Sequence, residues 1–301
     1  MERGRAQLSL DLDDPRGLRL RVDGDMEDCS VLSLGRKVSL ERLGAEEFIH
    51  HPVEPKKGVR QDISVGRGTD SWVPMDQIPR FVTAAAVVTE DRSFYTHKGV
   101  RWNLVARGLK MNLAHGRFVY GGSTITQQLV KNLFLTREKT LSRKLEELVI
   151  SWAMERVLSK EEILELYMNV IEYGPDIYGL RNASHHYFGK PPGELSPIEA
   201  AFIMGLKPYP RGGYLQWERR RLSRWWVSRL KKVLEMMHRR EKAITLAEVE
   251  AGAPYNHLDF RKRGESLWGG TPYVRPGRND RDEDQLDADG QRDGEPRVRV
   301  P

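Results

Sequence analysis

Apolar and polar residues alternate in the first fifty positions of the chain, with the two-residue period of a half-buried β-strand. One alternating run ends at Leu12 and a second starts at Leu18, and the Asp-Asp-Pro-Arg-Gly sequence between them favours a turn. Apolar residues between Val31 and Leu40 predict one or two further strands. Three or four short strands make a thin core. We therefore expect residues 1–50 to be the end of a larger β-rich region, either truncated or packed against a helical domain.

The spacing of apolar residues lengthens to three and four positions from Val73 onward, which is typical of amphipathic helices. Ser123 or Thr124 can cap one of these helices, and Ser159 and Glu162 have the spacing of a capping box for another. The predicted helices cover residues 76–88, 102–115, 124–133, 139–158, 160–168, 177–187, 196–206 and 218–240. The chain is therefore predicted to be mainly α, with a short β-rich segment before the helical part.

Composition changes along the chain in ways that suggest its domain boundaries. Residues 275–301 are rich in Arg, Asp, Glu and Gly, with almost no apolar side chains, so burial cannot offset their ordering entropy and we expect disorder. Residues 51–71, between the β-rich and the helical patterns, are interpreted as a linker. The 301-residue chain then holds one large domain, expected at residues 72–274, which is long enough to bury a core.

The net charge of +6 and the isoelectric point near 9.3 favour acidic partners, such as nucleic acid, an anionic membrane surface or a phosphorylated substrate. The one cysteine, Cys29, excludes an internal disulfide and a cysteine-based zinc cluster. No apolar stretch reaches the roughly 18 residues that a membrane span requires, and the first residues do not lead into the apolar core of a signal peptide.

Glu90 closely follows the apolar run Ala84–Val88 and begins the sequence Glu-Asp-Arg-Ser-Phe-Tyr-Thr-His-Lys-Gly. Burial raises the pKa of a carboxyl group, and a pKa closer to neutrality suits a general base that takes a proton from a sugar hydroxyl. A surface carboxylate paired with Arg92 or His97 is the simpler interpretation of the same residues.

A second polar block, residues 121–132, begins with two glycines and is crowded with polar side chains where an ordinary helix has a buried stripe. Those side chains belong to Ser123, Thr124, Thr126, Gln127, Gln128 and Lys131. Glycine lets a ligand approach the backbone closely, and the amides and dipole of a helix N-terminus favour a phosphate. A solvated helix start with a Ser or Thr cap is the plain alternative.

Arg143, Lys144 and Glu147 are spaced so that all three share one face of a helix. Two neighbouring cations favour the ionised form of Glu147, which makes it a poor proton donor but suits it to orienting cations or holding a metal. A surface ion-pair ladder, worth roughly a few tenths of a kcal/mol per pair, is the favoured interpretation without further context.

Together these blocks resemble the family 51 glycosyltransferases, which polymerise the glycan strands of peptidoglycan from lipid II. The family patterns are Glu-Asp-x-x-Phe-x-x-His-x-Gly, then Gly-x-Ser-Thr-Ile-Thr-Gln-Gln ending in Lys-Asn, then Arg-Lys-x-x-Glu. Two further family blocks are similar to residues 162–174 and 200–205, and all five occur here in the family's order. Over about residues 72–215, the resemblance implies a lysozyme-like helical domain of the monofunctional type, related to the glycosyltransferase domain of class A penicillin-binding proteins.

The family motifs imply roles for individual residues. Glu90 is implied as the general base and Glu147 as the second essential carboxylate. Residues implied to contact the substrate and its pyrophosphate are Arg92, His97, Ser123, Thr124, Gln127, Lys131, Asn132, Lys139, Arg143 and Lys144. In the implied inverting reaction, Glu90 deprotonates the 4-hydroxyl of an acceptor GlcNAc, whose oxygen displaces the lipid pyrophosphate from the donor MurNAc. No cofactor is required, and Mg²⁺ or another divalent cation at Glu147 is an optional addition.

The resemblance also implies a location and partners. Lipid II, the growing glycan strand and the outer leaflet of the inner membrane are the expected partners, with other cell-wall synthesis proteins as further candidates and no nucleic acid. The expected site of action is the periplasmic face of that membrane, and the usual transmembrane anchor is not in this chain. Pro175-Asp176 and residues 206–210 depart from the family's usual turns, which affects the subfamily rather than the reaction.

Three other functions compete with this one. A muramidase or lytic transglycosylase is the nearest enzyme, since the family fold is itself lysozyme-like. A basic helical protein that binds nucleic acid is suggested by Trp225, Trp226 and the cations around them, although no DNA- or RNA-binding motif accompanies them. An inactive scaffold is the third, and the presence of every implied catalytic residue argues against it.

Overall fold

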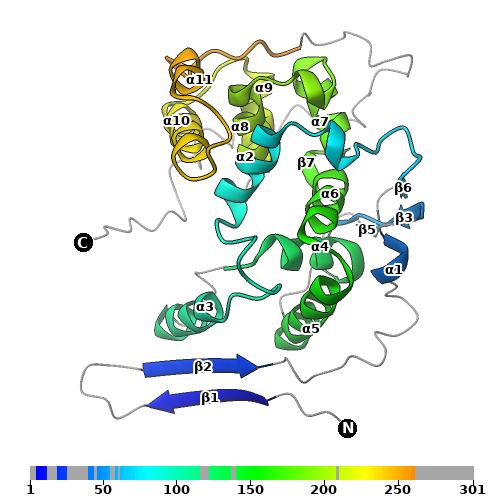
Figure 1. The fold of residues 1–301 in the computed structure, drawn as a ribbon, viewed down its shortest axis with the longest axis vertical. Helices are drawn as coiled ribbons and strands as arrows, with labels where there is room; N and C mark the ends of the chain where they lie inside the picture. Colours follow the sequence, from blue (N-terminus) through cyan, green and yellow to red (C-terminus); the bar gives the residue numbers. More distant parts are fainter. Residues whose placement is uncertain are drawn as a thin grey trace. The chain divides into compact units, whose positions relative to one another are not determined.

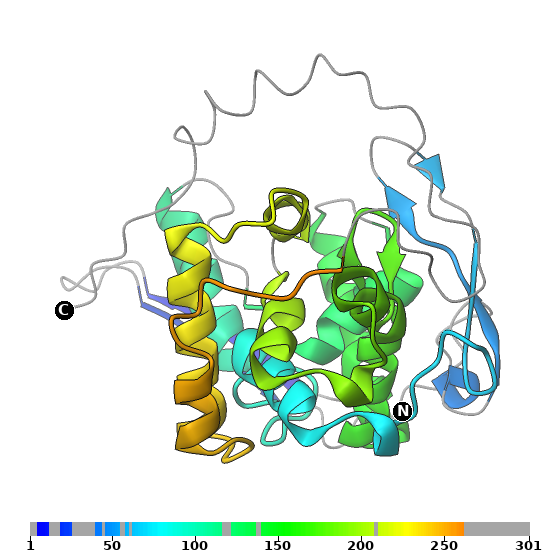
Figure 2. The ribbon, with the colours of Figure 1, turned by 90° about the horizontal axis from the view of Figure 1, so that it is seen from above.

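The computed structural model describes residues 5–11, 19–25, 40–43, 46–54, 58–59, 62–115, 122–136, 140–207 and 210–261, and these are mainly helical, as predicted (Figure 1, Figure 2). The helical elements are α1 (Leu40–Leu43), η1 (Met75–Gln77), α2 (Arg80–Glu90), α3 (Trp102–His115), α4 (Ile125–Phe134), α5 (Leu141–Val157), α6 (Lys160–Val170), α7 (Leu180–Phe188), η2 (Pro192–Glu194), α8 (Pro197–Gly205), α9 (Pro210–Glu218), α10 (Arg224–Arg239) and α11 (Leu246–Ala251). The expected disorder of residues 275–301 lies outside the described residues.

The N-terminal strands form a hairpin. Strand β1 (Arg5–Asp11) pairs antiparallel with β2 (Arg19–Asp25), in a register that sets Leu10 opposite Leu20, so the two strands predicted there are confirmed. The strand prediction was wrong at Leu40, which begins the short helix α1. Leu40 and Leu43 lie three residues apart on one helix face and are both buried, and this burial favours a helical turn over a strand. Residues 31–39, where the remaining strand was expected, lie outside the described residues.

The stretch interpreted as a linker contains short strands. These are β4 (Val53–Glu54), β5 (Gly58–Val59) and β6 (Ile63–Val65), and β6 pairs antiparallel with β3 (Phe48–His50). Val65 is buried in the hydrophobic core, and the Trp72 indole donates a hydrogen bond to Glu165 on α6 at 3.0 Å. Contacts with the core therefore begin before residue 72, while the domain boundaries themselves stay a prediction.

Two groups of packed helices position the site. Helices α2, α8 and α10 pack on one another, and α4 packs against both α5 and α6 (Figure 1). Helix α8 is apolar almost all round and its residues 199–205 are all buried, so it forms the centre of the first group. Glu90 is the last residue of α2, so the packing of this group holds the helix end that carries it.

Proline and glycine account for two of the helix boundaries that differ from the predictions. Helix α2 begins at Arg80 rather than at residue 76, because Pro79 adopts an extended backbone and constrains Ile78 in the same way. The helix predicted for 177–187 begins only at Leu180. Residues 177–178 instead form strand β8, which pairs with β7 (Glu172–Gly174), and Gly179 turns the chain with a φ of 80°.

The helix predicted for residues 218–240 begins only at Arg224, as α10, and Glu218 is instead the last residue of the preceding helix α9. Helix α9 ends at Glu218, Arg220 has a positive φ of 53°, and α10 begins after Ser223, whose side chain accepts from the Trp226 amide. A Ser cap here satisfies an amide that has no partner within the helix, and it therefore starts a new helix rather than continuing the old one.

Candidate active site

Glu90 is the last residue of α2, and its side chain is half-buried. The run Ala84–Val88 before it is buried, with no residue more than 5% exposed, so the helix holds the Glu90 carboxylate next to the hydrophobic core. Burial raises the pKa of the Glu90 carboxyl above its ordinary value, which is the direction expected from the sequence.

One neutral side chain contacts the Glu90 carboxylate directly. The Gln128 side-chain amide on α4 donates from Nε2 to Glu90 Oε2 at 2.8 Å, and the Tyr167 hydroxyl on α6 donates to Gln128 Oε1 at 3.2 Å. A hydrogen-bond donor favours the ionised carboxylate and so opposes the effect of burial on its pKa. Neither Gln128 nor Tyr167 was among the predicted site residues.

Three cations act on Glu90 from different elements. Lys207 follows α8, Arg229 lies on α10 and Lys131 lies on α4, and each lowers the pKa of Glu90 by Coulombic attraction, less strongly than burial raises it. Arg229 is held in place by two carbonyl oxygens, those of Gly205 at 3.2 Å and Lys207 at 2.6 Å. The outcome is a carboxylate with an elevated proton affinity in a cationic surrounding.

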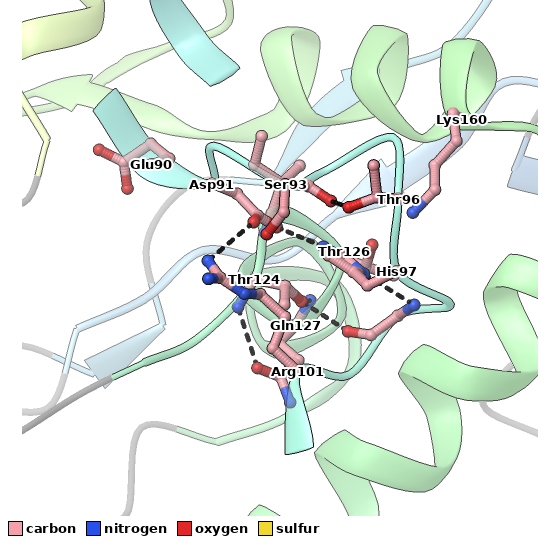
Figure 3. A network of polar contacts seen from close by, with 12 residues as sticks. Glu90, Asp91, Ser93, Thr96, His97, Arg101, Thr124, Thr126, Gln127 and Lys160 are labelled. Atoms are coloured by element: carbon pink, nitrogen blue, oxygen red, sulfur yellow. Dashed lines mark hydrogen bonds and ion pairs between the residues drawn. The ribbon is translucent and has the colours of Figure 1, made fainter. Parts of the chain in front are cut away.

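Asp91, the next residue, is buried and structural (Figure 3). Its Oδ2 accepts from the His97 ring at 2.7 Å and from the Ile125 amide at the start of α4 at 3.2 Å, and Arg101 lies 3.5 Å from its Oδ1. The Gly99 amide donates to His97 Nδ1 at 3.1 Å, so the proton of a neutral His97 lies on Nε2 and faces Asp91. This network fixes the loop after Glu90 to the N-terminus of α4.

A second buried group continues the network on the other side of α4. Glu155 on α5 accepts from the Thr126 hydroxyl at 2.5 Å and pairs with Lys160 on α6 at 2.6 Å. The Lys160 ammonium also lies 4.5 Å from the centre of the Phe94 ring, in the loop after Glu90. Glu155 and Lys160 were not among the predicted site residues, because each looks like an ordinary helix-surface charge until the helices are packed.

The start of α4 is organised by a capping box. The Thr124 side chain accepts from the Gln127 amide at 3.1 Å and donates to the Gly99 carbonyl at 2.7 Å, while Gln127 Oε1 accepts from the Thr124 amide at 2.9 Å. This confirms Thr124 as a cap. Gln127 Nε2 is buried and has no hydrogen-bond partner among the described residues. One buried donor at a helix N-terminus is therefore available to an oxygen-rich ligand.

Glu147 on α5 is buried, and each of its two carboxylate oxygens contacts a cationic side chain. Arg143 lies 2.7 Å from its Oε2, and Lys144 contacts its Oε1. Lys144 also donates to the Ser123 hydroxyl at 3.1 Å, which links the pair to the residue before the α4 cap. Arg143 Nε is buried and has no hydrogen-bond partner in the described part of the chain. The prediction that the three residues share one helix face is confirmed. Glu147 itself is buried, whereas the Lys144 side chain is 34% exposed, so only part of the cluster lies at the surface.

The other predicted site residues have different surroundings. Arg92 is exposed and donates to the Val88 carbonyl at 3.4 Å, whereas Asn132 donates to the backbone oxygen of Gln128 at 2.9 Å. His97, as described above, belongs to the Asp91 network. Lys139 lies outside the described residues. A substrate contact for any of these residues stays a prediction.

The described residues include no group of three or more His, Cys, Asp or Glu side chains that could together hold a metal ion. Nor does any helix among them have the length and apolar character required to cross a membrane.

Two carboxylates with different surroundings, those of Glu90 and Glu147, are both linked to the start of α4. Glu90 is contacted through Gln128 and Glu147 is linked through Lys144 to Ser123, so residues 123–128 at the start of α4 lie between them. A carboxylate of raised pKa can accept a proton, and a cation cluster at a helix N-terminus can neutralise an anion. These are the parts of a group-transfer site whose leaving group is anionic.

Comparison with known proteins identifies the family. A family model described as "Transglycosylase" matches residues 59–238. The chain belongs to this transglycosylase family.

Proteins named biosynthetic peptidoglycan transglycosylase are similar to it. The one from Dechloromonas aromatica (strain RCB) is 40% identical over 153 residues, which are 51% of this chain and 66% of the relative. That from Paraburkholderia xenovorans (strain LB400) is 40% identical over 152 residues, 50% of this chain and 62% of the relative. That from Burkholderia cenocepacia (strain HI2424) is 44% identical over 140 residues, 46% of this chain and 57% of the relative. The chain therefore spans less than two thirds of the length of these relatives.

Proposed function

We propose that this protein is a peptidoglycan glycosyltransferase that polymerises lipid II into β-1,4-linked glycan strands and releases undecaprenyl pyrophosphate. The observation that carries the proposal is the first part of α4. Gln128 contacts Glu90 at 2.8 Å, and Ser123 contacts Lys144 at 3.1 Å, which in turn pairs with Glu147. A proton acceptor and a cation cluster thus flank one segment, and the family relationship supports the same reaction.

Glu90 acts on the acceptor sugar. In its ionised form, it removes the proton of the GlcNAc 4-hydroxyl, and the oxygen attacks the anomeric carbon of the donor MurNAc from the face opposite the lipid pyrophosphate. The raised pKa makes Glu90 a stronger base than an ordinary carboxylate, while Gln128 and the surrounding cations keep the ionised form accessible. The carbon–oxygen bond to the pyrophosphate breaks as the new bond forms, which inverts the configuration.

The departing pyrophosphate takes the electron pair of the broken bond and needs neutralisation more than it needs a proton. Arg143 and Lys144 are held near the start of α4 by Glu147 and Ser123. Two buried N–H groups, Gln127 Nε2 and Arg143 Nε, have no hydrogen-bond partner among the described residues. Phosphate oxygens are suitable acceptors for such donors, and Lys131 extends the positive charge toward Glu90.

No step of this mechanism passes through a metal ion. Both Oε atoms of Glu147 already contact cationic side chains, so a divalent ion there would have to displace Lys144 or Arg143. This arrangement does not fit a metal site made of protein ligands alone. A divalent cation that arrives bound to the substrate pyrophosphate is compatible with the same geometry.

The proposed location is the outer leaflet of the inner membrane, on its periplasmic face, where the lipid-linked substrate and the growing strand are found. Other cell-wall synthesis proteins are proposed partners, and nucleic acid is not. Helix α3, with Arg101 just before it and Arg107 and Lys110 along it, is proposed as the surface that reaches the headgroup region.

The test is a product assay with purified full-length protein and fluorescent lipid II in detergent, read out by gel separation of glycan polymers. Polymer formation is expected, and purified sacculi incubated in parallel are expected to release no fragments. A muramidase or lytic transglycosylase would give the reverse pattern. A salt-sensitive shift of a DNA duplex at sub-micromolar protein, with neither glycan activity, would favour the nucleic-acid-binding alternative.

A further inference from the structure

We propose that Tyr167 is a positioning residue for Glu90, acting through the side-chain amide of Gln128. The proposal rests on the function proposed above and adds a residue on a third helix to its machinery. Tyr167 lies on α6, Gln128 on α4 and Glu90 at the end of α2, and two hydrogen bonds join them in sequence. The Tyr167 hydroxyl is thus linked to Glu90 only indirectly in this chain of bonds, through Gln128.

The amide of Gln128 has two unlike ends, and only one of them can face an ionised carboxylate favourably. Its NH₂ group donates to Glu90, whereas its oxygen in the same place would repel Glu90. A phenol donates a hydrogen bond much more readily than it accepts one. Because the Tyr167 hydroxyl is 3.2 Å from Gln128 Oε1, it favours the orientation that leaves the NH₂ group directed at Glu90.

The surroundings of Tyr167 keep its hydroxyl protonated, so it remains a hydrogen-bond donor. Its side chain is fully buried, and burial raises the pKa of its hydroxyl well above the ordinary value, with the charge of Glu90 contributing in the same direction. The hydroxyl therefore keeps its proton at every pH at which the enzyme works. A neighbouring tyrosine, Tyr173, is equally buried, but its hydroxyl lies near the Met168 carbonyl instead, at 3.3 Å.

The groups around Glu90 affect its pKa in two ways, by their charge and by a hydrogen bond. Lys131 on α4, Lys207 after α8 and Arg229 on α10 attract its negative charge. Tyr167 and Tyr173 are the titratable neighbours whose own pKa values the charge of Glu90 raises, so both stay protonated. Gln128, by contrast, donates a hydrogen bond directly to the Glu90 carboxylate. Removing the Tyr167 hydroxyl therefore loosens the direct donor and leaves the cations where they are. Glu90 should then hold its proton more tightly.

The experiment uses the full chain with the substitutions Tyr167→Phe and Gln128→Met and the double variant. The acid limb of kcat/KM against pH is measured with lipid II, and Glu90 is titrated independently by ¹³C NMR of labelled glutamate carboxyls, assigned with Glu90→Gln. We expect Tyr167→Phe to move both midpoints upward by about 0.5–1 pH unit, since a hydrogen bond to a charged group is partly lost. At high pH its rate should return to within about twofold of the unsubstituted protein.

The double variant tests whether Tyr167 acts through Gln128. If it does, Tyr167→Phe causes no further shift once Gln128→Met is present. Tyr187→Phe is the matched control, because Tyr187 is also buried and donates to a backbone carbonyl, that of Tyr173, at 2.9 Å. It should leave both midpoints unchanged.

Two results would overturn the proposal. One is an unshifted Glu90 titration in Tyr167→Phe, and the other is a rate loss of the same size at every pH, as a purely structural defect would give. The proposed function fails separately, if the unsubstituted protein makes no polymer. In that case the NMR titration still decides whether Tyr167 controls Glu90.

Discussion

The two carboxylates that are linked to the start of α4, Glu90 on α2 and Glu147 on α5, have opposite surroundings. Glu90 is half-buried, receives one hydrogen bond from a neutral amide, and has its pKa raised because burial outweighs the attraction of the nearby cations. Glu147 is buried as well, but Arg143 and Lys144 contact both of its oxygens. Burial with a neutral partner makes a base, whereas burial with two direct cations makes a holder of positive charge. The roles proposed for the two glutamates, a proton acceptor and a holder of cations, follow from this difference in their contacts.

Of the substitutions that distinguish Glu90 from Glu147, Glu90→Gln is expected to have the largest effect, a loss of activity. A glutamine keeps the shape of the side chain and cannot accept the proton, so kcat for lipid II polymerisation should fall by about 10²–10⁴-fold. The KM for lipid II should change by less than about threefold, since the cation cluster is intact. Steady-state kinetics and circular dichroism check this together. A variant that keeps a third or more of the normal kcat removes Glu90 from the mechanism.

A smaller effect, on stability, is expected on the Glu147 side. Arg143→Ala leaves a buried carboxylate with Lys144 alone, and should lower the free energy of unfolding by about 2–3 kcal/mol in urea denaturation. In a Glu147→Gln background the same substitution should cost less than half as much, because no buried charge remains to be compensated. An equal loss of unfolding free energy in the two backgrounds would mean that the ion pair with Glu147 does not hold Arg143 in place.

The smallest effect is expected again at Glu90, with the opposite sign. Because its pKa is raised in the folded protein, the folded state binds more protons than the unfolded state above pH 4.5, and stability falls as pH rises through this range. Glu90→Gln removes that loss. It should raise the free energy of unfolding at pH 7 by about 0.5–2 kcal/mol, the usual range for stabilising replacements, and by little near pH 4. Thermal unfolding at the two pH values measures this, and a destabilised variant at pH 7 would contradict it.

Local features of this fold could be predicted from the sequence, and long-range ones could not. Thr124 and Ser159 were recognisable as caps, because a capping box needs only residues three apart. The raised pKa of Glu90 was foreseeable from the apolar run before it. By contrast, the Tyr167 contact with Gln128 joins residues 39 apart, and that between Glu155 and Thr126 joins residues 29 apart. No periodicity along the chain encodes such a pair.

The sequence was least informative where a polar residue had two possible uses. His97 was expected at the substrate, but its ring is engaged by Asp91 and the Gly99 amide. Thr124 and Gln127 were expected there too, and most of their hydrogen bonds belong to the helix cap. Spacing identifies which residues are polar and near one another, while only packing decides which of their atoms remain available.

The pH dependence of kcat/KM for lipid II polymerisation examines the role of Glu90 without changing any residue. Measured on the full chain from about pH 4 to 9, it should show one acid limb, because the free enzyme must have Glu90 ionised to accept the proton. We expect the midpoint of that limb above 4.5, the ordinary value for a glutamate, and we expect the residual activity of Glu90→Gln to lack the limb. A midpoint at or below 4.5, or the same limb in Glu90→Gln, would show that another group is the base.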